Sequence, residues 1–244
     1  LKFEGEYIGG VGEMFAGFLE IERFSEYDNN GNLLKTKTGG QIDESVVEYT
    51  YNPLNQLIQF TDDKGKLTDY SYYPDGMRKG KTANGATTQF YWDRGYISNE
   101  ETGNDTTTNL IGVGGIFGRI EGSNTSVMLK NGHGDVASLV SSGAVTKTYD
   151  YDPYGVEKDL DPNDTNPFRY CAEYFDSETN NIYLRARYYN PAISRFISED
   201  PHWNTSNMVY GDSGNGGVPN INAIRESSNL YVCAMSNPIM FFDP

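Results

Sequence analysis

The sequence has no long hydrophobic run. No stretch approaches the roughly 18 apolar residues that a membrane-spanning helix needs. The chain starts at Leu1 rather than at methionine, shows no signal-peptide pattern, and stops abruptly at Asp243-Pro244. We therefore expect no membrane span in these residues, and we interpret the chain as a piece of a longer polypeptide.

Positive charge is scarce. The chain has 19 Lys and Arg residues against 34 Asp and Glu residues, which gives a net charge of −15, and it contains no basic cluster. Binding to the phosphates of nucleic acids requires a basic face, so the sequence predicts no nucleic-acid partner. The acidic balance either keeps the chain soluble or forms a wall that repels acidic partners and holds a basic one.

Cysteine and histidine are rare, with two residues of each. Cys171 and Cys233 lack the CxxC spacing of a zinc ribbon and lie among aromatic and apolar residues, so we expect buried thiols rather than a disulfide. His133 and His202 stand far apart in loop-like sequence, and the GxSxG, phosphate-loop and HExxH signatures are missing. The sequence thus predicts no metal site and no cofactor.

Aromatic residues are abundant instead. They make up 14% of the chain, and 19 of them are tyrosines, whose rings cover apolar surface while their hydroxyls stay in water. Aromatic pairs two positions apart recur, with Met128 in a degenerate copy: Tyr49/Tyr51, Tyr70/Tyr72, Phe90/Trp92 and Tyr149/Tyr151. Because residues i and i+2 of a strand face the same way, we expect the rings of tyrosines 49, 51, 70 and 72 to share one face of neighbouring strands.

Turn-forming residues follow the aromatic pairs, for example at 28–31, 52–55, 74–76 and 152–155. Asp and Asn start turns by accepting hydrogen bonds from the nearby backbone, and Gly supplies positive φ. We predict an all-β fold with one hairpin per repeat and one short helix near residues 221–226. An ordinary meander or sandwich is the alternative.

Several motifs resemble those of the Rhs/YD-repeat family. Residues 27–33, YDNNGNL, match the core of a YD repeat, and HGDV at 133–136 with YDYDPYG at 149–155 resembles the last repeats before the Rhs-associated core domain. The signature of that domain is the most specific match: NPFRY at 166–170, EYFDSET at 173–179, YLRARYYNP at 183–191, RFISEDP at 195–201, and a closing motif at 229–231 and 237–244. By this resemblance, residues 1–160 are YD/Rhs repeats and residues 161–244 form the core domain.

The resemblance implies a hollow shell, in which a β-sheet spirals into a cocoon and the core domain plugs one end. In toxin-bearing members the shell encloses a variable C-terminal toxin, and an aspartate-based self-cleavage separates the two. The implied partners are the toxin domain, the upstream part of the shell and, as a further candidate, an immunity protein against the toxin. The implied location is outside the producing cell, secreted or on its surface.

Asp243 matches the first aspartate of the family's cleavage motif. The second aspartate lies beyond residue 244, so this chain carries at most one of the two catalytic carboxyls. Two carboxyls that share a proton can act as acid and base. The alternatives are that Asp243 only turns the chain towards the toxin, or that Asp200, in the core signature, takes the catalytic role.

Eight residues of the core signature are expected to hold that domain together: Arg185, Arg187, Tyr188, Tyr189, Arg195, Phe196, Asp200 and Pro201. On a strand, Arg185 and Arg187 would share a face. The expected partner carboxylates are Asp176, Glu178, Glu199 and Asp200. A buried structural network, an exposed surface pair and direct assistance to cleavage are the alternatives.

Two functions remain open at this point. The first is a shell that encapsulates and delivers a C-terminal toxin and releases it by self-cleavage downstream of Pro244. The alternative is a cell-surface adhesion or carbohydrate-binding module without a toxin, because exposed tyrosines can stack on sugars. A short variable domain after residue 244 would favour the first.

Overall fold

The computed structural model describes residues 2–8, 21–39, 44–199 and 229–233. These residues are almost entirely β, as the repeats and turns predicted, and their only helical segments are two short 3-10 turns. The helix expected near residues 221–226 lies outside the described residues. The first fourteen strands are β1 (Lys2–Ile8), β2 (Ile21–Tyr27), β3 (Leu33–Gly39), β4 (Glu44–Tyr51), β5 (Leu57–Thr61), β6 (Leu67–Tyr72), β7 (Arg78–Ala83), β8 (Ala86–Asp93), β9 (Tyr96–Thr102), β10 (Asp105–Gly112), β11 (Gly115–Glu121), β12 (Asn124–Lys130), β13 (Val136–Ser141) and β14 (Ala144–Thr148).

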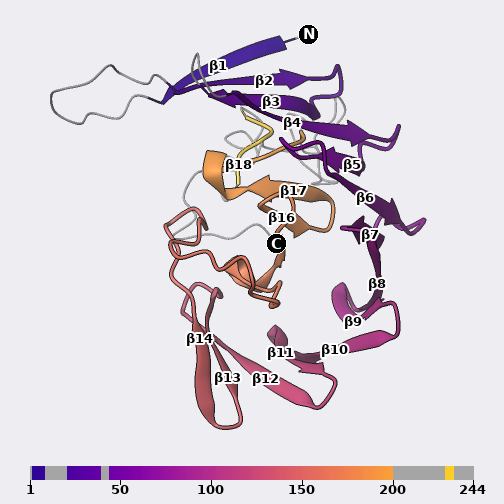
Figure 1. Cartoon of the computed structure of the whole chain (residues 1–244), viewed down its shortest axis with the longest axis vertical. Helices are drawn as coiled ribbons and strands as arrows, with labels where there is room; N and C mark the ends of the chain where they lie inside the picture. The colour runs from indigo at the N-terminus through magenta and orange to yellow at the C-terminus, as the bar shows by residue number, and fades with distance from the viewer. Residues whose placement is uncertain (1, 9–20, 40–43, 200–228, 234–244) are drawn as a thin grey trace, which may run out of the picture.

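These fourteen strands form one sheet, called the repeat sheet below, in which spatial order equals chain order. Each strand pairs antiparallel with the strand before it and the strand after it. Figure 1 shows the sheet curving through a wide arc from β1 to β14. Only short turns are needed to build such a sheet, because no connection crosses from one edge to the other.

One repeat is one hairpin. Tyr49 and Tyr51 lie in β4, and Tyr70 and Tyr72 lie in β6. All four belong to or pack against one hydrophobic cluster, so the predicted shared face is confirmed. The two strands are not adjacent, however, because β5 pairs with both of them. The repeat period covers two strands, and the aromatic pairs therefore recur on every second one.

The first residue of each repeating pair is the most deeply buried. Tyr49, Tyr70, Phe90, Met128 and Tyr149 all lie in the same cluster, so Met128 does occupy the aromatic position of its repeat. The second residue of the early pairs follows a shift of register, for example between Ser71 and Tyr72. Such bulges increase the local twist of a strand, which favours the curvature of the sheet.

The turns follow the predicted chemistry. The side-chain oxygen of Asp28 accepts hydrogen bonds from the backbone amides of Asn30 and Asn32, both at 2.8 Å. Asp62 holds the amides of Lys64 and Lys66 in the same way, at 2.9 and 2.7 Å. The same side-chain cap recurs at three more turns, which begin at Asn52, Asn131 and Asp152. The short polar side chain at the first position thus closes the hairpin.

The described residues from 161 onward, called the core segment below, form a second and smaller unit. Its elements are η1 (Tyr170–Ala172), β15 (Tyr174–Asp176), β16 (Asn181–Leu184), β17 (Arg187–Asn190), η2 (Pro191–Ile193) and β18 (Arg195–Phe196). Strands β15–β18 make a four-stranded antiparallel sheet. Figure 1 shows this sheet inside the arc of the repeat sheet. Its tyrosines Tyr174, Tyr183 and Tyr188 join the same hydrophobic cluster, whereas Tyr189 is buried in a second cluster with Phe196. The main core of the molecule therefore lies between the two sheets.

Two smaller expectations can be compared with the structure. Cys171 and Cys233 were expected to be buried, and both are half-buried. Within the ranges that the structure describes, no helix combines the length and the apolar character that crossing a membrane requires.

Candidate functional site

The interface between the repeat sheet and the core segment contains a fully buried ion pair. Arg78 of β7 and Asp176 of β15 have no exposed side-chain surface, and Nη1 of Arg78 donates to Oδ2 of Asp176 at 2.5 Å. Lys81 of the same strand donates to Oδ1 of Asp176 at 3.1 Å and to Oε2 of Glu178 at 2.9 Å. Burial opposes ionisation, but Arg78 and Lys81 together hold the pKa of the Asp176 carboxyl below its ordinary value.

Aromatic rings enclose the Arg78 guanidinium. Its central carbon lies 4.3 Å from the ring centre of Tyr183, 4.6 Å from that of Phe90 and 4.8 Å from that of Tyr174. Nε and Nη2 have no hydrogen-bond partner among the described residues. The negative faces of the rings replace those hydrogen bonds in part, since a desolvated cation is attracted to the ring quadrupole. Burial also raises the pKa of the Tyr183 hydroxyl to about 12, so this hydroxyl stays protonated.

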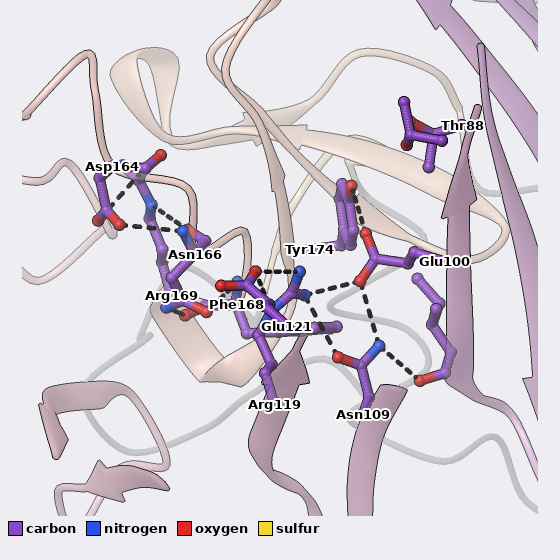
Figure 2. Close-up of polar contacts among 12 residues, drawn as sticks. Thr88, Glu100, Asn109, Arg119, Glu121, Asp164, Asn166, Phe168, Arg169 and Tyr174 are labelled. Carbon is purple, nitrogen blue, oxygen red and sulfur yellow. Dashed lines mark hydrogen bonds and ion pairs between the residues drawn. The ribbon is translucent and has the colours of Figure 1, made fainter. Parts of the chain in front are cut away.

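Figure 2 shows a second buried network, around Glu100 and Arg119. Nη1 of Arg119 donates to Oε1 of Glu100 at 2.6 Å, and Nδ2 of Asn109 donates to the same oxygen at 3.2 Å. The hydroxyl of Tyr174 reaches the other oxygen of Glu100 at 3.2 Å. Three strands of the repeat sheet, β9, β10 and β11, thereby hold a residue of β15. Tyr174 thus touches both networks, because its ring also faces Arg78.

A third arginine, Arg169, is buried on the other side of the core segment. Its Nη1 donates to Oε2 of Glu157 at 2.7 Å, and its Nη2 lies 3.4 Å from Oδ2 of Asp164. Burial raises the pKa of the Glu157 carboxyl, although the guanidinium acts in the opposite direction. Figure 2 shows Arg169, Asp164 and Asn166 on the far side of Phe168 from Glu100. This network joins the end of the last repeat to the start of the core segment.

Arg185 and Arg187 do not share a strand face, so that prediction is wrong. Arg185 lies in the two-residue turn between β16 and β17, with φ of 57°, and only Arg187 is in a strand. Arg185 does pair with a carboxylate of the core segment, Glu173, at 3.0 Å, and this partner was not among those expected. Nη1 of Arg187 donates to the carbonyl oxygen of Leu230 at 3.3 Å, and its guanidinium stacks on Phe196.

Three of the other predicted core residues, Tyr188, Tyr189 and Phe196, are buried. The hydroxyl of Tyr188 lies 3.2 Å from that of Tyr72 in the repeat sheet. Phe196 is buried against Tyr189, and Arg195 begins β18. Asp200, Pro201 and Asp243 lie outside the described residues, so their predicted roles stay predictions.

Sequence reasoning missed Arg78, Lys81, Glu100 and Arg119. One signal could have found Arg78. It is the direct cross-strand partner of Tyr72, whose ring was expected to face inward. Cross-strand partners point to the same face, so the turn at residues 73–77 already places Arg78 inside. No local signal of this kind identifies Asp176 as the partner of Arg78, because the two residues are 98 positions apart in the chain.

A cavity of about 340 Å³ opens beside these networks. Trp92, Tyr96 and Tyr183 line it together with the Arg185–Glu173 pair. Burial raises the pKa of the Glu173 carboxyl, so its protonated form persists to higher pH than usual. Flat rings beside a polar pair are suited to a planar group or a sugar ring.

Comparison with curated proteins identifies tRNA nucleases and a surface protein. The chain is 28% identical over 228 residues to the tRNA nuclease WapA of Bacillus subtilis strain 168, covering 88% of this chain and 9% of that protein. It is 24% identical over 209 residues to salivary gland surface protein 1 of Aedes aegypti, covering 76% of this chain and 6% of that protein. The chain thus spans less than a tenth of the length of these relatives. No protein-family model matches it.

Solved structures share the fold. A crystal structure of TcdB2-TccC3-Cdc42 superposes with a TM-score of 0.59 at 18% identity, covering 99% of this chain and 14% of that one. The Photorhabdus luminescens Tc holotoxin pore gives 0.60 at 17% identity, covering 93% of this chain and 13% of that one. The all-β architecture that the sequence predicted is therefore confirmed, and the fold is similar to that of these two structures.

Proposed function

Because the chain resembles the Rhs/YD-repeat toxins in its motifs, its relatives and its fold, we propose that it is the C-terminal part of a shell that encloses and delivers a C-terminal toxin. Residues 1–160 would be shell wall and residues 161–244 the plug that closes it. The enclosed toxin domain and the upstream part of the shell would be its partners, with an immunity protein in the producing cell. The complete protein would act outside that cell, secreted or on the surface.

One observation carries this proposal. The repeat sheet curves around the core segment, and the buried Arg78–Asp176 pair fastens the two together. A container needs a rigid wall and a fixed end piece, and buried, paired charges define a single docking geometry. An adhesion module would instead be expected to leave its aromatic face open, whereas the rings of Tyr49, Tyr70 and Phe90 are covered.

We extend the proposal to toxin release by an aspartate pair that includes Asp243. The proline after Asp243 restricts the backbone there, and the enclosed space would exclude bulk water so that two carboxyls adopt different pKa values. The test is Asp243→Asn in the full-length protein, followed on a denaturing gel, because Asn keeps the shape and removes the proton. We expect wild type to run as two fragments and the variant as one band.

Two other aspartates that precede proline supply a matched control, Asp161, and a test of the alternative, Asp200. Asp161→Asn changes a half-exposed residue that pairs with Lys147, and it should leave cleavage unchanged. Asp200→Asn tests the alternative catalytic residue. Unchanged cleavage in Asp243→Asn would show that Asp243 is structural.

Encapsulation can be tested separately from cleavage. Limited proteolysis of the native full-length protein should leave the toxin domain intact, while the same protease should digest it after the shell is unfolded. Digestion of the toxin domain at equal rates in both states would contradict the shell.

The alternative function is a surface module that binds carbohydrate. The aromatic cavity beside Arg185 and the similarity to a salivary gland surface protein favour it. Binding of the full-length protein to immobilised glycans, lost in Tyr96→Ala, would support this function. Equal binding by wild type and variant would remove the cavity from consideration.

A further inference from the structure

The cavity between the repeat sheet and the core segment is lined by two cations and one carboxylate. Lys130 ends β12, Arg185 lies in the turn between β16 and β17, and Glu173 directly precedes β15. All three side chains are half-buried. The charged lining therefore has one positive charge in excess, within a chain whose net charge is −15. Small anions are attracted to this cavity, whereas the chain as a whole repels them.

The two cations are only partly neutralised by their neighbours. Nη2 of Arg185 donates to Oε1 of Glu173 at 3.0 Å and Nε donates to the carbonyl oxygen of Gly95 at 3.1 Å, but Nη1 makes no hydrogen bond with a described residue. Nζ of Lys130 donates to the carbonyl oxygen of Gly114 at 3.3 Å, and within the described part of the chain no ion pair joins it to a carboxylate. Burial lowers the pKa of the Lys130 ammonium. A carboxylate bound in the cavity would supply the charged partner that this ammonium lacks.

Two half-buried aromatic rings line the same cavity, and both are held in place. Nε1 of Trp92 donates to the carbonyl oxygen of Arg78 at 2.8 Å, and the indole meets the ring of Tyr183 edge-on, with 6.2 Å between the ring centres. The ring of Tyr96 packs against Gly115, where an added Cβ would lie 3.0 Å from Cε1 of the tyrosine. Rings that are already fixed can stack on the face of a sugar ring with little further loss of entropy.

Polar atoms beside the rings are available for the hydroxyl groups of a ligand. The hydroxyl of Tyr96 and Oε2 of Glu173 make no hydrogen bond with a described residue. Burial raises the pKa of the Glu173 carboxyl, and in its protonated form this group donates as well as accepts. An aromatic carboxylate without hydroxyls would leave these groups unused, whereas a sugar uses them. A volume of about 340 Å³ is near the lower limit of small-molecule sites, which favours a single ring over a chain of sugars.

We propose that this cavity binds an acidic sugar, a pyranose ring that carries one carboxylate. The ring stacks on Tyr96, the carboxylate pairs with Lys130, and Arg185 and Glu173 form hydrogen bonds with the remaining oxygens and hydroxyls. This proposal rests on the carbohydrate-binding alternative above and names the class of sugar. It does not depend on whether the complete protein encloses a toxin.

The experiment compares glucuronate with glucuronamide as ligands of the full-length protein, by ligand-observed NMR titration. The two compounds share the ring and its hydroxyls, and only glucuronate is charged. We expect glucuronate to bind at least about tenfold more tightly, the effect of one charge-assisted contact. Lys130→Met keeps most of the side-chain stem and should make the two affinities equal. Lys79→Met removes the same charge from an exposed position of β7 outside the cavity, and it should keep the preference.

The wild-type protein alone can overturn the proposal. Equal affinity for the two compounds would remove the preference for an acidic sugar and leave carbohydrate binding in place, whereas binding of neither compound would remove both. Toxin enclosure is decided independently by the proteolysis experiment. Added salt should weaken the binding of glucuronate but not of glucuronamide.

A preference that survives in Lys130→Met would also overturn the proposal, because the carboxylate would then lie elsewhere. Circular dichroism identifies a folding failure, and for a misfolded Lys130→Met the variant Lys130→Gln and the salt dependence of the wild type decide in its place.

Discussion

The repeat sheet and the core segment are stabilised in different ways. In the repeat sheet every strand pairs with its neighbours in the chain, and side-chain caps close several of its turns. The core segment has strands of two to four residues and takes left-handed backbone at several residues that are not glycine: Cys171, Ala172, Asn180, Arg185 and Ser194. Such short, strained elements are marginal alone, so the core segment depends on the sheet around it.

The ion pairs show the same contrast. Lys37 and Glu44, both in the repeat sheet, pair at 2.9 Å with 44% and 57% of their side chains exposed. Arg78 and Asp176 pair across the interface with no exposure at all. Water screens the first pair, whereas Lys81 and aromatic rings surround the second one. The Arg78–Asp176 pair at the interface is therefore expected to matter more for stability than the Lys37–Glu44 pair on the surface of the repeat sheet.

The largest expected effect comes from Asp176→Ala. It leaves Arg78 and Lys81 buried without their carboxylate, and we expect the free energy of unfolding to fall by about 3–5 kcal/mol. Lys37→Ala, the matched control in the exposed pair, should change it by at most about 1 kcal/mol. Urea denaturation of the two variants measures both losses of free energy. Equal losses would show that the buried pair contributes no more to stability than the exposed pair.

Acid should remove the contribution of Asp176. Its pKa is lowered in the folded protein, so its stabilisation is fully present above the unfolded value of about 3.9 and is lost as pH falls through the folded value. The difference in melting temperature between wild type and Asp176→Asn should therefore be constant near neutral pH and shrink below about pH 4. A difference that widens on acidification would mean that Asp176 is not the ionised partner of Arg78.

Two glycines with positive φ distinguish the cost of a left-handed backbone from the cost of a steric clash when each is replaced by alanine. Gly155 has φ of +91°, and a Cβ there would lie 2.7 Å from Cδ1 of Tyr170 in the core segment. Gly65 has φ of +77° and open space around it. Gly65→Ala should cost about 1–2 kcal/mol from the left-handed backbone alone, and Gly155→Ala should cost about 1–3 kcal/mol more from overpacking. Thermal denaturation of the two variants tests this, and equal losses would contradict the close contact.

Arg185 should have the smallest effect. Its pair with Glu173 is about a quarter exposed, so Arg185→Ala is expected to cost about 1 kcal/mol or less. Because Arg185 has φ of 57°, Arg185→Gly should be less destabilising than Arg185→Ala. Melting temperatures that rank the two variants in the opposite order would mean that the side-chain stem, rather than the backbone, matters at this turn.

Much of the fold could be predicted because its causes are local. The aromatic spacing identified the inward face at Tyr49 and Tyr70, and the Asp and Asn residues identified the turns, since each effect involves residues close in the chain. The prediction for Arg185 and Arg187 failed because it assumed a continuous strand through the core signature. The tight turn between Leu184 and Arg187, which pair directly across β16 and β17, breaks that strand.

The sequence by itself determined the all-β class, the hairpin repeat, the turn positions and the resemblance to Rhs/YD-repeat proteins, because all of these are carried by short motifs. Only the tertiary structure decided which charges are buried and which side chains meet. Arg78 pairs with Asp176, which is 98 residues away in the chain, and the Asp135 carboxylate accepts a hydrogen bond from the amide of Cys171, which is 36 residues away. Both contacts form because the repeat sheet curves back over the core segment. That curvature arises from small twists and bulges summed over fourteen strands, and no single motif encodes it.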